Sequence, residues 1–240
     1  MEINFHILIG KNCVKIDFRA GRYISFTIYP FSFREFKDLN ANYTFDNYIE
    51  YGGMPFLSSI DFEPSNSKNY LKDLFNSIMF KDIVKRNKIS DIDLLERIIA
   101  YVLANVGKSF SANSISKFFK SEKRTASPET ILNYLKACEE AFLLYRLKYQ
   151  DLNGKRILKV NEKYYAIDHG LREAVIGKNL KNAEIILENI VCLELLRRGY
   201  KTTVGRAHEK EIDFACEKNG EKIYLQVCYL LNRILDFYFQ

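Results

Sequence analysis

Two polar residues in the C-terminal part of the chain have types and spacing that could bind a divalent metal ion. Asp213 lies in the apolar run Glu211–Cys216, and Gln226 follows in a second apolar run, Lys222–Val227. Mg²⁺ takes oxygen ligands, and a bound Mg²⁺ promotes attack on a phosphoryl group. We therefore name Asp213 and Gln226 as candidate residues of a metal site.

Local patterns predict the elements that position these residues. Asn219-Gly220 separates the two apolar runs, and both residue types readily adopt the positive φ of a tight hairpin. Residues 183–198 read as a helix that carries Glu188, and Lys201–Val204 reads as a first strand. A helix with an acid, a strand, a strand with Asp and a strand with a polar residue, in that order, resemble the restriction-endonuclease-like fold.

The resemblance implies an active site that this sequence retains only in part. The resemblance makes Glu188 and Asp213 the candidate metal ligands, and both together with Gln226 the candidate catalytic positions. In that fold the third strand carries Glu-x-Lys, and here it carries Gln226-Val227-Cys228. A thiol cannot replace an ammonium, and loss of such a group costs about 10²–10³ in rate. Lys222 is about 20 Å from Cys228 along the same strand. We expect a vestigial, inactive site, in which Asp213 and Gln226 form a buried hydrogen-bonded pair that fixes the strand register.

The positive charge of the chain is concentrated in its middle. Residues 108–163 contain 12 Lys and Arg against 6 Asp and Glu, which accounts for the whole net charge of +6. A basic segment can be a footprint for phosphate groups. It is also compatible with an ordinary solvated helical surface.

The same basic segment has a pattern typical of a winged helix. Residues 111–119 and 127–138 read as two helices, and Phe142–Tyr149 and Lys163–Ile167 read as two wing strands. The second helix offers few side chains that read bases, so we expect docking to a protein partner ahead of sequence-specific DNA binding. The candidate contacts for nucleic acid are Lys117, Lys120, Lys123, Arg124, Asn133 and Lys136.

Composition indicates a cytoplasmic globular protein. Hydrophobic residues make up 48% of the 240 residues, yet no apolar run reaches the roughly 20 residues of a membrane helix. Neither a membrane partner nor a secretory signal is expected, and the sequence does not indicate an oligomeric state. Five scattered cysteines without a CxxC pair read as reduced core residues: Cys13, Cys138, Cys192, Cys216 and Cys228.

The first 107 residues contain short strands followed by helices. Phe5–Ile9 and Tyr23–Tyr29 read as strands, and a helix beginning near Ser32 has Glu35 in the capping-box position. Residues 45–51, 70–85 and 93–106 have helical spacing of apolar residues. The two strands look like the end of an α/β domain.

Over nearly its whole length the chain resembles the C-terminal portion of a family of bacterial and archaeal AAA-type ATP-binding proteins. That family joins an ATPase core to a C-terminal domain of unknown function. Eight segments carry the resemblance: Arg19-Ala20-Gly21-Arg22-Tyr23, Pro30-Phe31-Ser32-Phe33-Arg34-Glu35-Phe36, Tyr51-Gly52-Gly53-Met54-Pro55, Ser127-Pro128-Glu129-Thr130-Ile131, Ile167-Asp168-His169-Gly170-Leu171-Arg172, Leu187-Glu188-Asn189-Ile190-Val191, Arg197-Arg198-Gly199-Tyr200, and Glu211-Ile212-Asp213-Phe214 with Tyr224-Leu225-Gln226-Val227.

The resemblance implies a mixed α and α/β fold in four parts. These are the remnant of a P-loop ATPase sheet (1–40), a helical connector (41–107), a winged helix (108–168) and a shortened restriction-endonuclease-like module (169–240). It also implies that Asn12, Arg19 and Arg22 are remnants of the ATP-sensing residues.

The ATPase motifs themselves do not occur in this sequence. Neither a Walker A loop nor a Walker B acid is present, so we expect no cofactor in this chain, with ATP and Mg²⁺ confined to full-length relatives. The chain then reads as a fragment, or a shortened relative, that acts as a binding or docking module without ATPase activity. The alternative is a DNA-binding protein or a metal-dependent nuclease.

Overall fold

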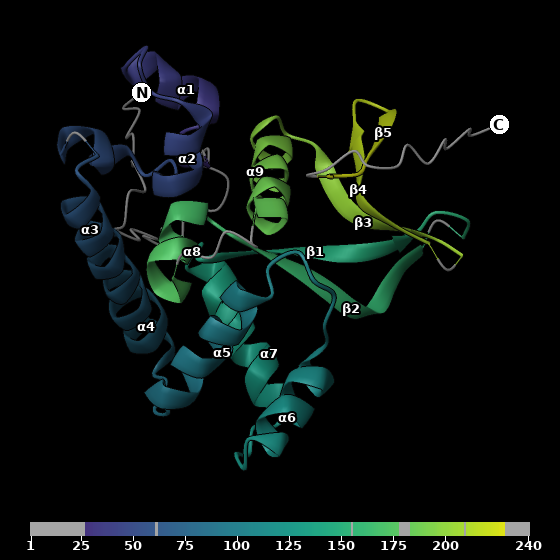
Figure 1. Cartoon of the computed structure of the whole chain (residues 1–240). Helices are drawn as coiled ribbons and strands as arrows, with labels where there is room; N and C mark the ends of the chain where they lie inside the picture. The colour runs from purple at the N-terminus through teal and green to yellow at the C-terminus, as the bar shows by residue number, and fades with distance from the viewer. Residues whose placement is uncertain (1–26, 61, 155, 178–182, 209, 229–240) are drawn as a thin grey trace, which may run out of the picture.

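A five-stranded mixed sheet lies at the centre of the computed structural model, which describes residues 27–60, 62–154, 156–177, 183–208 and 210–228 (Figure 1). Its order is β2-β1-β3-β4-β5, and neighbouring strands are antiparallel except β1 and β3, which are parallel. The broad prediction of a mixed α and β fold is therefore confirmed. The strands are β1 (Leu144–Asp151), β2 (Arg156–Ala166), β3 (Lys201–Ala207), β4 (Lys210–Lys218) and β5 (Glu221–Leu225).

Helices make up most of the remaining described chain, and several begin at caps that the sequence indicates. Ser32 and Glu35 form the predicted capping box, and Ser127 caps a helix that begins with Pro128. No helix of the described residues is long and apolar enough to cross a membrane. The helical elements are α1 (Phe33–Leu39), α2 (Phe45–Tyr51), η1 (Pro55–Ile60), α3 (Pro64–Ser77), η2 (Ile78–Val84), α4 (Lys85–Asn87), α5 (Ile92–Ala104), α6 (Ala112–Ser121), α7 (Pro128–Glu140), α8 (His169–Ile176) and α9 (Ala183–Arg197).

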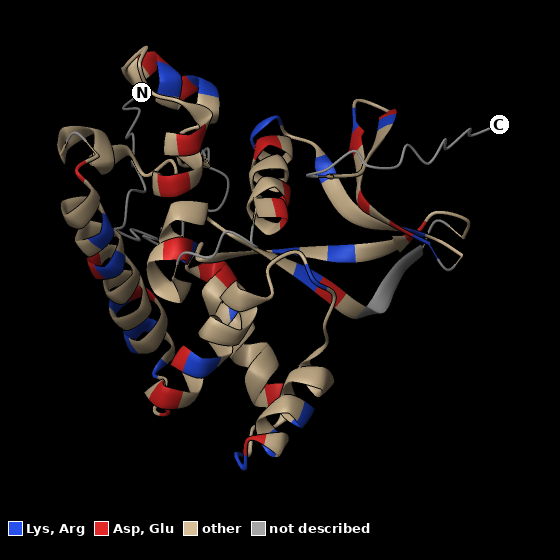
Figure 2. Ribbon diagram, viewed as in Figure 1, with Lys and Arg blue, Asp and Glu red and all other residues tan. Residues whose placement is uncertain are grey.

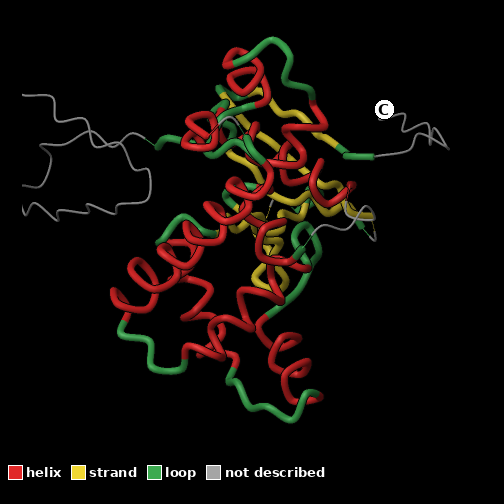
Figure 3. Tube along the Cα trace, turned by 60° about the vertical axis from the view of Figure 1, so that its left-hand side comes forward, coloured by secondary structure: helices red, strands yellow, loops and turns green. Residues whose placement is uncertain are grey.

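Helices and strands share one continuous core. Helix α9 packs on β2, β3 and β4, while α5 packs on β2 and α7 on β1. In Figure 1, α9 lies above β1 and β2 and beside β3 to β5, while α5 to α7 lie below β1. Figure 3 shows the strands gathered together, with much of the helical part extending beyond them. A single cluster of buried residues runs from Phe36 in α1 to Cys216 in β4.

Helix α8 joins the N-terminal helices to the sheet through buried polar contacts. The carboxylate of Asp168 caps α8 at Leu171 N–H (2.8 Å) and accepts a second bond from Gly53 N–H (2.7 Å). Arg172 donates from Nε to the carbonyl oxygen of Leu103 in α5 (2.7 Å). At Gly170, an added Cβ would lie 2.0 Å from the carbonyl oxygen of Tyr51. Only glycine therefore fits at this helix crossing.

Part of the sequence prediction lies outside the described residues. The strand expected at residues 5–9 and the candidate residues Asn12, Arg19 and Arg22 all precede residue 27. Of the second expected strand, residues 27–29 are described, and they are not in a strand.

Candidate functional site

A buried lysine forms the centre of the candidate site. The Nζ atom of Lys163 in β2 lies 3.1 Å from Glu188 Oε1, 2.8 Å from Glu211 Oε1 and 3.3 Å from Asp213 Oδ1. The lysine side chain is only 3% exposed. Its ammonium therefore neutralises part of a cluster of three carboxylates, which we call the Lys163 cluster.

Two tyrosines complete the hydrogen bonds of the Lys163 cluster. Tyr165 donates from its hydroxyl to Glu188 Oε1 (2.7 Å), and Tyr149 donates to Glu211 Oε2 (2.6 Å). Burial and the bond to Glu211 raise the pKa of Tyr149 to about 12. Both phenols therefore remain donors at neutral pH.

Strand periodicity places these side chains on one face of the sheet. Lys163 and Tyr165 are two residues apart in β2, and Glu211 and Asp213 are two apart in β4. In a flat sheet β2 and β4 would be about 14 Å apart, because two other strands separate them. The contact of Lys163 with Asp213 therefore requires a curved sheet.

Helix α9 positions Glu188 over that face. Asn189 accepts a hydrogen bond from Ala166 N–H (2.8 Å) and donates one to the Ala166 carbonyl (3.0 Å), which joins α9 to the end of β2. A Cβ at Gly107 would lie 2.7 Å from Glu188 Oε2, so the carboxylate rests against a glycine backbone. The Asn189 bonds fix α9 against β2, and the Gly107 backbone lies against the Glu188 carboxylate.

The charges of the Lys163 cluster shift its pKa values. Burial alone would lower the pKa of Lys163, but the negative charges of Glu188, Glu211 and Asp213 outweigh burial and raise it. Burial raises the pKa of Glu188, and the charge of Lys163 opposes this rise. Lys163 is therefore a permanent cation at physiological pH.

Asp213 and Gln226 contact each other through the backbone. Gln226 Oε1 accepts from Asp213 N–H at 3.3 Å, and Asp213 Oδ2 accepts from Val227 N–H at 2.9 Å. The paired residues of β4 and β5 end at Phe214 and Leu225, so these two bonds extend the pairing beyond the ladder. The sequence suggested a buried hydrogen-bonded pair; the two residues do share a hydrogen bond, but Gln226 is exposed.

The donor set does not fit the Mg²⁺ that the nuclease-like resemblance implies. The Lys163 ammonium lies among the carboxylates, and the Gln226 carbonyl oxygen is bound by Asp213 N–H. Nowhere in the described ranges are three or more His, Cys, Asp or Glu side chains grouped so that they could hold a metal ion. Catalytic roles for Glu188, Asp213 and Gln226 stay predictions.

Sequence reasoning missed Lys163, Glu211, Tyr149 and Tyr165. The available signal was a lysine in the aromatic strand segment 163–167, because Lys is almost never buried without a partner. Cys228, which stands where the resemblance expects a lysine, is exposed.

The candidate nucleic-acid contacts lie together on α6, α7 and the turn between them. Lys117, Lys120, Lys123, Arg124, Asn133 and Lys136 are all exposed. Arg124 pairs with Asp93 of α5, and Lys136 pairs with Glu140 at 3.7 Å. Phe118 and Leu132 on the same helices are also exposed, by 42% and 47%.

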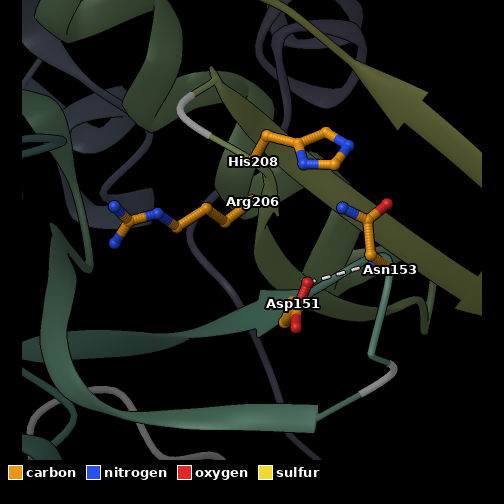
Figure 4. Close-up of a pocket in the computed structure, with 4 residues that line it drawn as sticks. All are labelled: Asp151, Asn153, Arg206 and His208. Atoms are coloured by element: carbon orange, nitrogen blue, oxygen red, sulfur yellow. Dashed lines mark hydrogen bonds between the residues drawn. The ribbon is translucent and has the colours of Figure 1, made fainter.

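A separate cavity of about 420 Å³ lies at the far end of the β1–β2 hairpin. Asp151, Asn153, Arg206 and His208 line it, and Asn153 N–H donates to Asp151 Oδ1 at 3.1 Å. Figure 4 shows Arg206 extending away from His208 and Asn153. The two basic side chains therefore do not converge on one ligand position.

Comparison with known proteins assigns the family. Residues 42–182 match the model of a domain of unknown function, DUF8612. The chain belongs to the DUF8612 family. The DUF8612 region includes Lys163 and Tyr165, whereas Glu188, Glu211 and Asp213 follow it. The Lys163 cluster therefore joins the family domain to the segment after it.

Two relatives show how far the similarity extends. A Haemophilus influenzae protein described as uncharacterized is 40% identical over 234 residues, covering 94% of this chain and 57% of the relative. An uncharacterized protein of Methanocaldococcus jannaschii is 30% identical, covering 88% of this chain and 51% of the relative. The chain spans about half the length of these relatives. No solved structure matches it.

These findings overturn the assignment to AAA-type ATP-binding proteins. The matching family is DUF8612, and neither relative is described as an ATPase or as binding ATP. The assignment was wrong because it rested on eight short segments, each of which is weak by itself. The ATP-sensing role of Asn12, Arg19 and Arg22 followed from it and loses its basis.

Proposed function

We propose that this chain is a nucleic-acid-binding module whose α6–α7 region contacts the phosphate backbone of a duplex. The observation that carries the proposal is the group Lys117, Lys120 and Lys123. These exposed lysines form no ion pair within the part of the chain that the structure describes. Free ammonium groups on adjacent turns suit a polyanion.

The order of elements supports a winged-helix arrangement of this module. Helix α5 is followed by Phe110, which bridges to Glu162 in β2, and then by α6, α7 and the β1–β2 hairpin. In helix-turn-helix proteins the second helix enters the major groove. That helix here is α7, which carries Glu129 and an exposed Leu132 on its outer surface. We therefore propose backbone contact without base reading.

A salt titration tests the proposal. A fluorescent duplex of mixed sequence should bind at low salt, and the logarithm of its affinity should fall linearly with the logarithm of salt concentration. Changing Lys117, Lys120 and Lys123 together to Ala should reduce the slope by about 3. The matched control changes three other exposed lysines, Lys37, Lys201 and Lys222. No binding at low salt, or equal loss in both triple variants, would contradict the proposal.

Docking of a protein partner is the second candidate function. Phe118 and Leu132 favour it, because exposed large apolar side chains are typical of protein interfaces. A partner held by these side chains would bind with little dependence on salt. Leu132→Ala should weaken protein docking and leave duplex affinity unchanged.

For the Lys163 cluster we propose a structural role rather than cleavage. Three carboxylates around one buried ammonium tie β2, β4 and α9 together. With Mg²⁺ or Mn²⁺ the chain should not nick supercoiled plasmid. Metal-dependent nicking that disappears in Asp213→Ala would show instead that the site is hydrolytic.

A further inference from the structure

Helices α3, η2 and α4 follow one another without a break, and the hydrogen-bond pattern changes within this run. Between α3 and α4, the segment η2 forms a π-helix, in which Lys85 N–H donates to the carbonyl of Phe80, five residues earlier. Such turns are rare and occur frequently at functional sites. The change places Phe80 one turn from Lys85 and Lys81 one turn from Arg86.

The inner side of this turn is core, and its outer side carries a ring among cations. Ile78, Met79 and Ile83 are buried, whereas Phe80 is 46% exposed. Close to Phe80 in the sequence, the cationic residues Lys81, Lys85, Arg86 and Lys88 are all exposed, and the acidic residue Asp82 is half-buried. Figure 2 shows basic and acidic segments along this part of the helix. We call Phe80 and the four cationic residues the Phe80 surface.

Among the described residues, the ring of Phe80 lacks the aromatic contact that the exposed rings of Phe56 and Phe118 have. Phe56 lies against Tyr70 with centroids 4.8 Å apart, and Phe118 lies against Tyr101 at 4.9 Å. Among the described residues no ring contact involves Phe80. At 46% exposure, part of the Phe80 side chain is open to solvent.

The four basic side chains of the Phe80 surface are also without an ion-pair partner among the described residues. The helix dipole favours cations in a C-terminal turn, which accounts for Lys85 and Arg86. It does not account for an exposed aromatic ring beside them.

We propose that the Phe80 surface binds single-stranded nucleic acid, with a base stacked on Phe80 and phosphates against the surrounding cations. Proteins that bind single strands without sequence preference combine aromatic platforms with a basic path for the backbone. A single strand suits this surface better than a duplex, because its unpaired bases offer a free face to the ring. The surface lies outside α6 and α7, so the inference does not depend on the duplex contact proposed above.

Anisotropy of a fluorescent oligothymidine of about 15 nucleotides tests the inference. Phe80→Ala should weaken binding about 5- to 100-fold, while Phe80→Tyr, which keeps a stacking face, should bind like the parent. Phe80→Leu, which has no aromatic face, should weaken binding as much as Phe80→Ala. Changing Lys81 and Lys85 to Ala should reduce the salt slope by about 1.4.

Matched controls separate this surface from general charge. Phe56→Ala removes another exposed ring, and Lys68→Ala with Lys72→Ala removes two exposed cations from the same helix. These variants should bind the oligonucleotide like the parent. Absence of oligonucleotide binding, equal losses in the controls, or full binding by Phe80→Leu would overturn the inference. Circular dichroism of each variant verifies that it is folded.

Discussion

At the scale of residues, the buried ammonium of Lys163 is the common partner of three carboxylates. Burying one ammonium against three carboxylates leaves the cluster with net negative charge, which two phenol hydroxyls and the Val227 amide partly stabilise. Buried ion pairs often contribute little beyond what apolar replacements would, but breaking one is costly. Removal of Lys163 is therefore the most informative single change.

Lys163→Met should lower the free energy of unfolding by about 3–5 kcal/mol, because it leaves buried carboxylates without a counterion. Urea unfolding at neutral pH measures the change. Lys148→Met, on the neighbouring strand at an exposed position, is the control and should change stability by about 0.5 kcal/mol or less. A loss below about 1 kcal/mol for Lys163→Met would mean that the carboxylates do not depend on it.

The raised pKa of Glu188 predicts a pH dependence. The usual pKa of a glutamate side chain is 4.5, and that of Glu188 in the folded protein is higher. As pH rises above 4.5, the unfolded chain therefore releases the Glu188 proton before the folded protein does. The folded protein then binds more protons than the unfolded chain, so its stability falls as pH rises. Glu188→Gln removes this pH dependence, so the free energy of unfolding of the variant, relative to that of the parent protein, should rise between about pH 4.5 and pH 7. Urea unfolding at several pH values measures it, with the exposed Glu184→Gln as control. If Glu188→Gln instead becomes less stable relative to the parent protein as pH rises, then Lys163 lowers the pKa of Glu188 below its usual value.

Only part of the Lys163 cluster could be predicted from sequence. Glu188 and Asp213 belong to a helix and a hairpin whose local patterns are clear, so their proximity followed from the order of elements. Lys163 comes from a strand 50 residues before Asp213, and it reaches that residue only because the sheet is curved. No local periodicity encodes sheet curvature.

At the scale of elements, agreement was best where a turn or cap has its own chemistry. Asn219 and Gly220 have φ values of 53° and 84°, as the hairpin prediction required. The helix predicted at 183–198 is α9, Ala183–Arg197. Helix α8 was not predicted, because it is only eight residues long and buries polar residues such as His169 and Arg172 beside apolar ones. The π-helical turn also has no simple sequence signature.

Gly170 provides a test at this scale in which two effects have opposite signs. In a helix interior, Gly→Ala ordinarily stabilises by about 0.8–1 kcal/mol. At Gly170 the new methyl group would collide with the Tyr51 carbonyl oxygen, so Gly170→Ala should destabilise by about 1–3 kcal/mol or more. Thermal unfolding decides between them. A raised melting temperature would show that α2 and α8 separate easily.

At the scale of the whole molecule, the sheet connects parts that the sequence suggested were separate. Strands β1 and β2 carry α7 and α5, and β1 also pairs with β3 of the C-terminal hairpin unit. The chain on both sides of the boundary predicted at 168–169 thus contributes strands to one sheet. We expect the α5–α7 region and the β3–β5 region to unfold together.

Leu135→Ala tests this coupling. Leu135 is 2% exposed in α7, and its truncation should cost about 2–5 kcal/mol. If folding is cooperative, hydrogen exchange of amides in β4 should accelerate by the factor that corresponds to this loss, although β4 does not contain the substitution. Leu132→Ala, in the same helix but 47% exposed, should leave β4 exchange unchanged. Normal β4 protection in a destabilised Leu135→Ala variant would instead establish two independently folding units, with the Lys163 cluster as a contact between them.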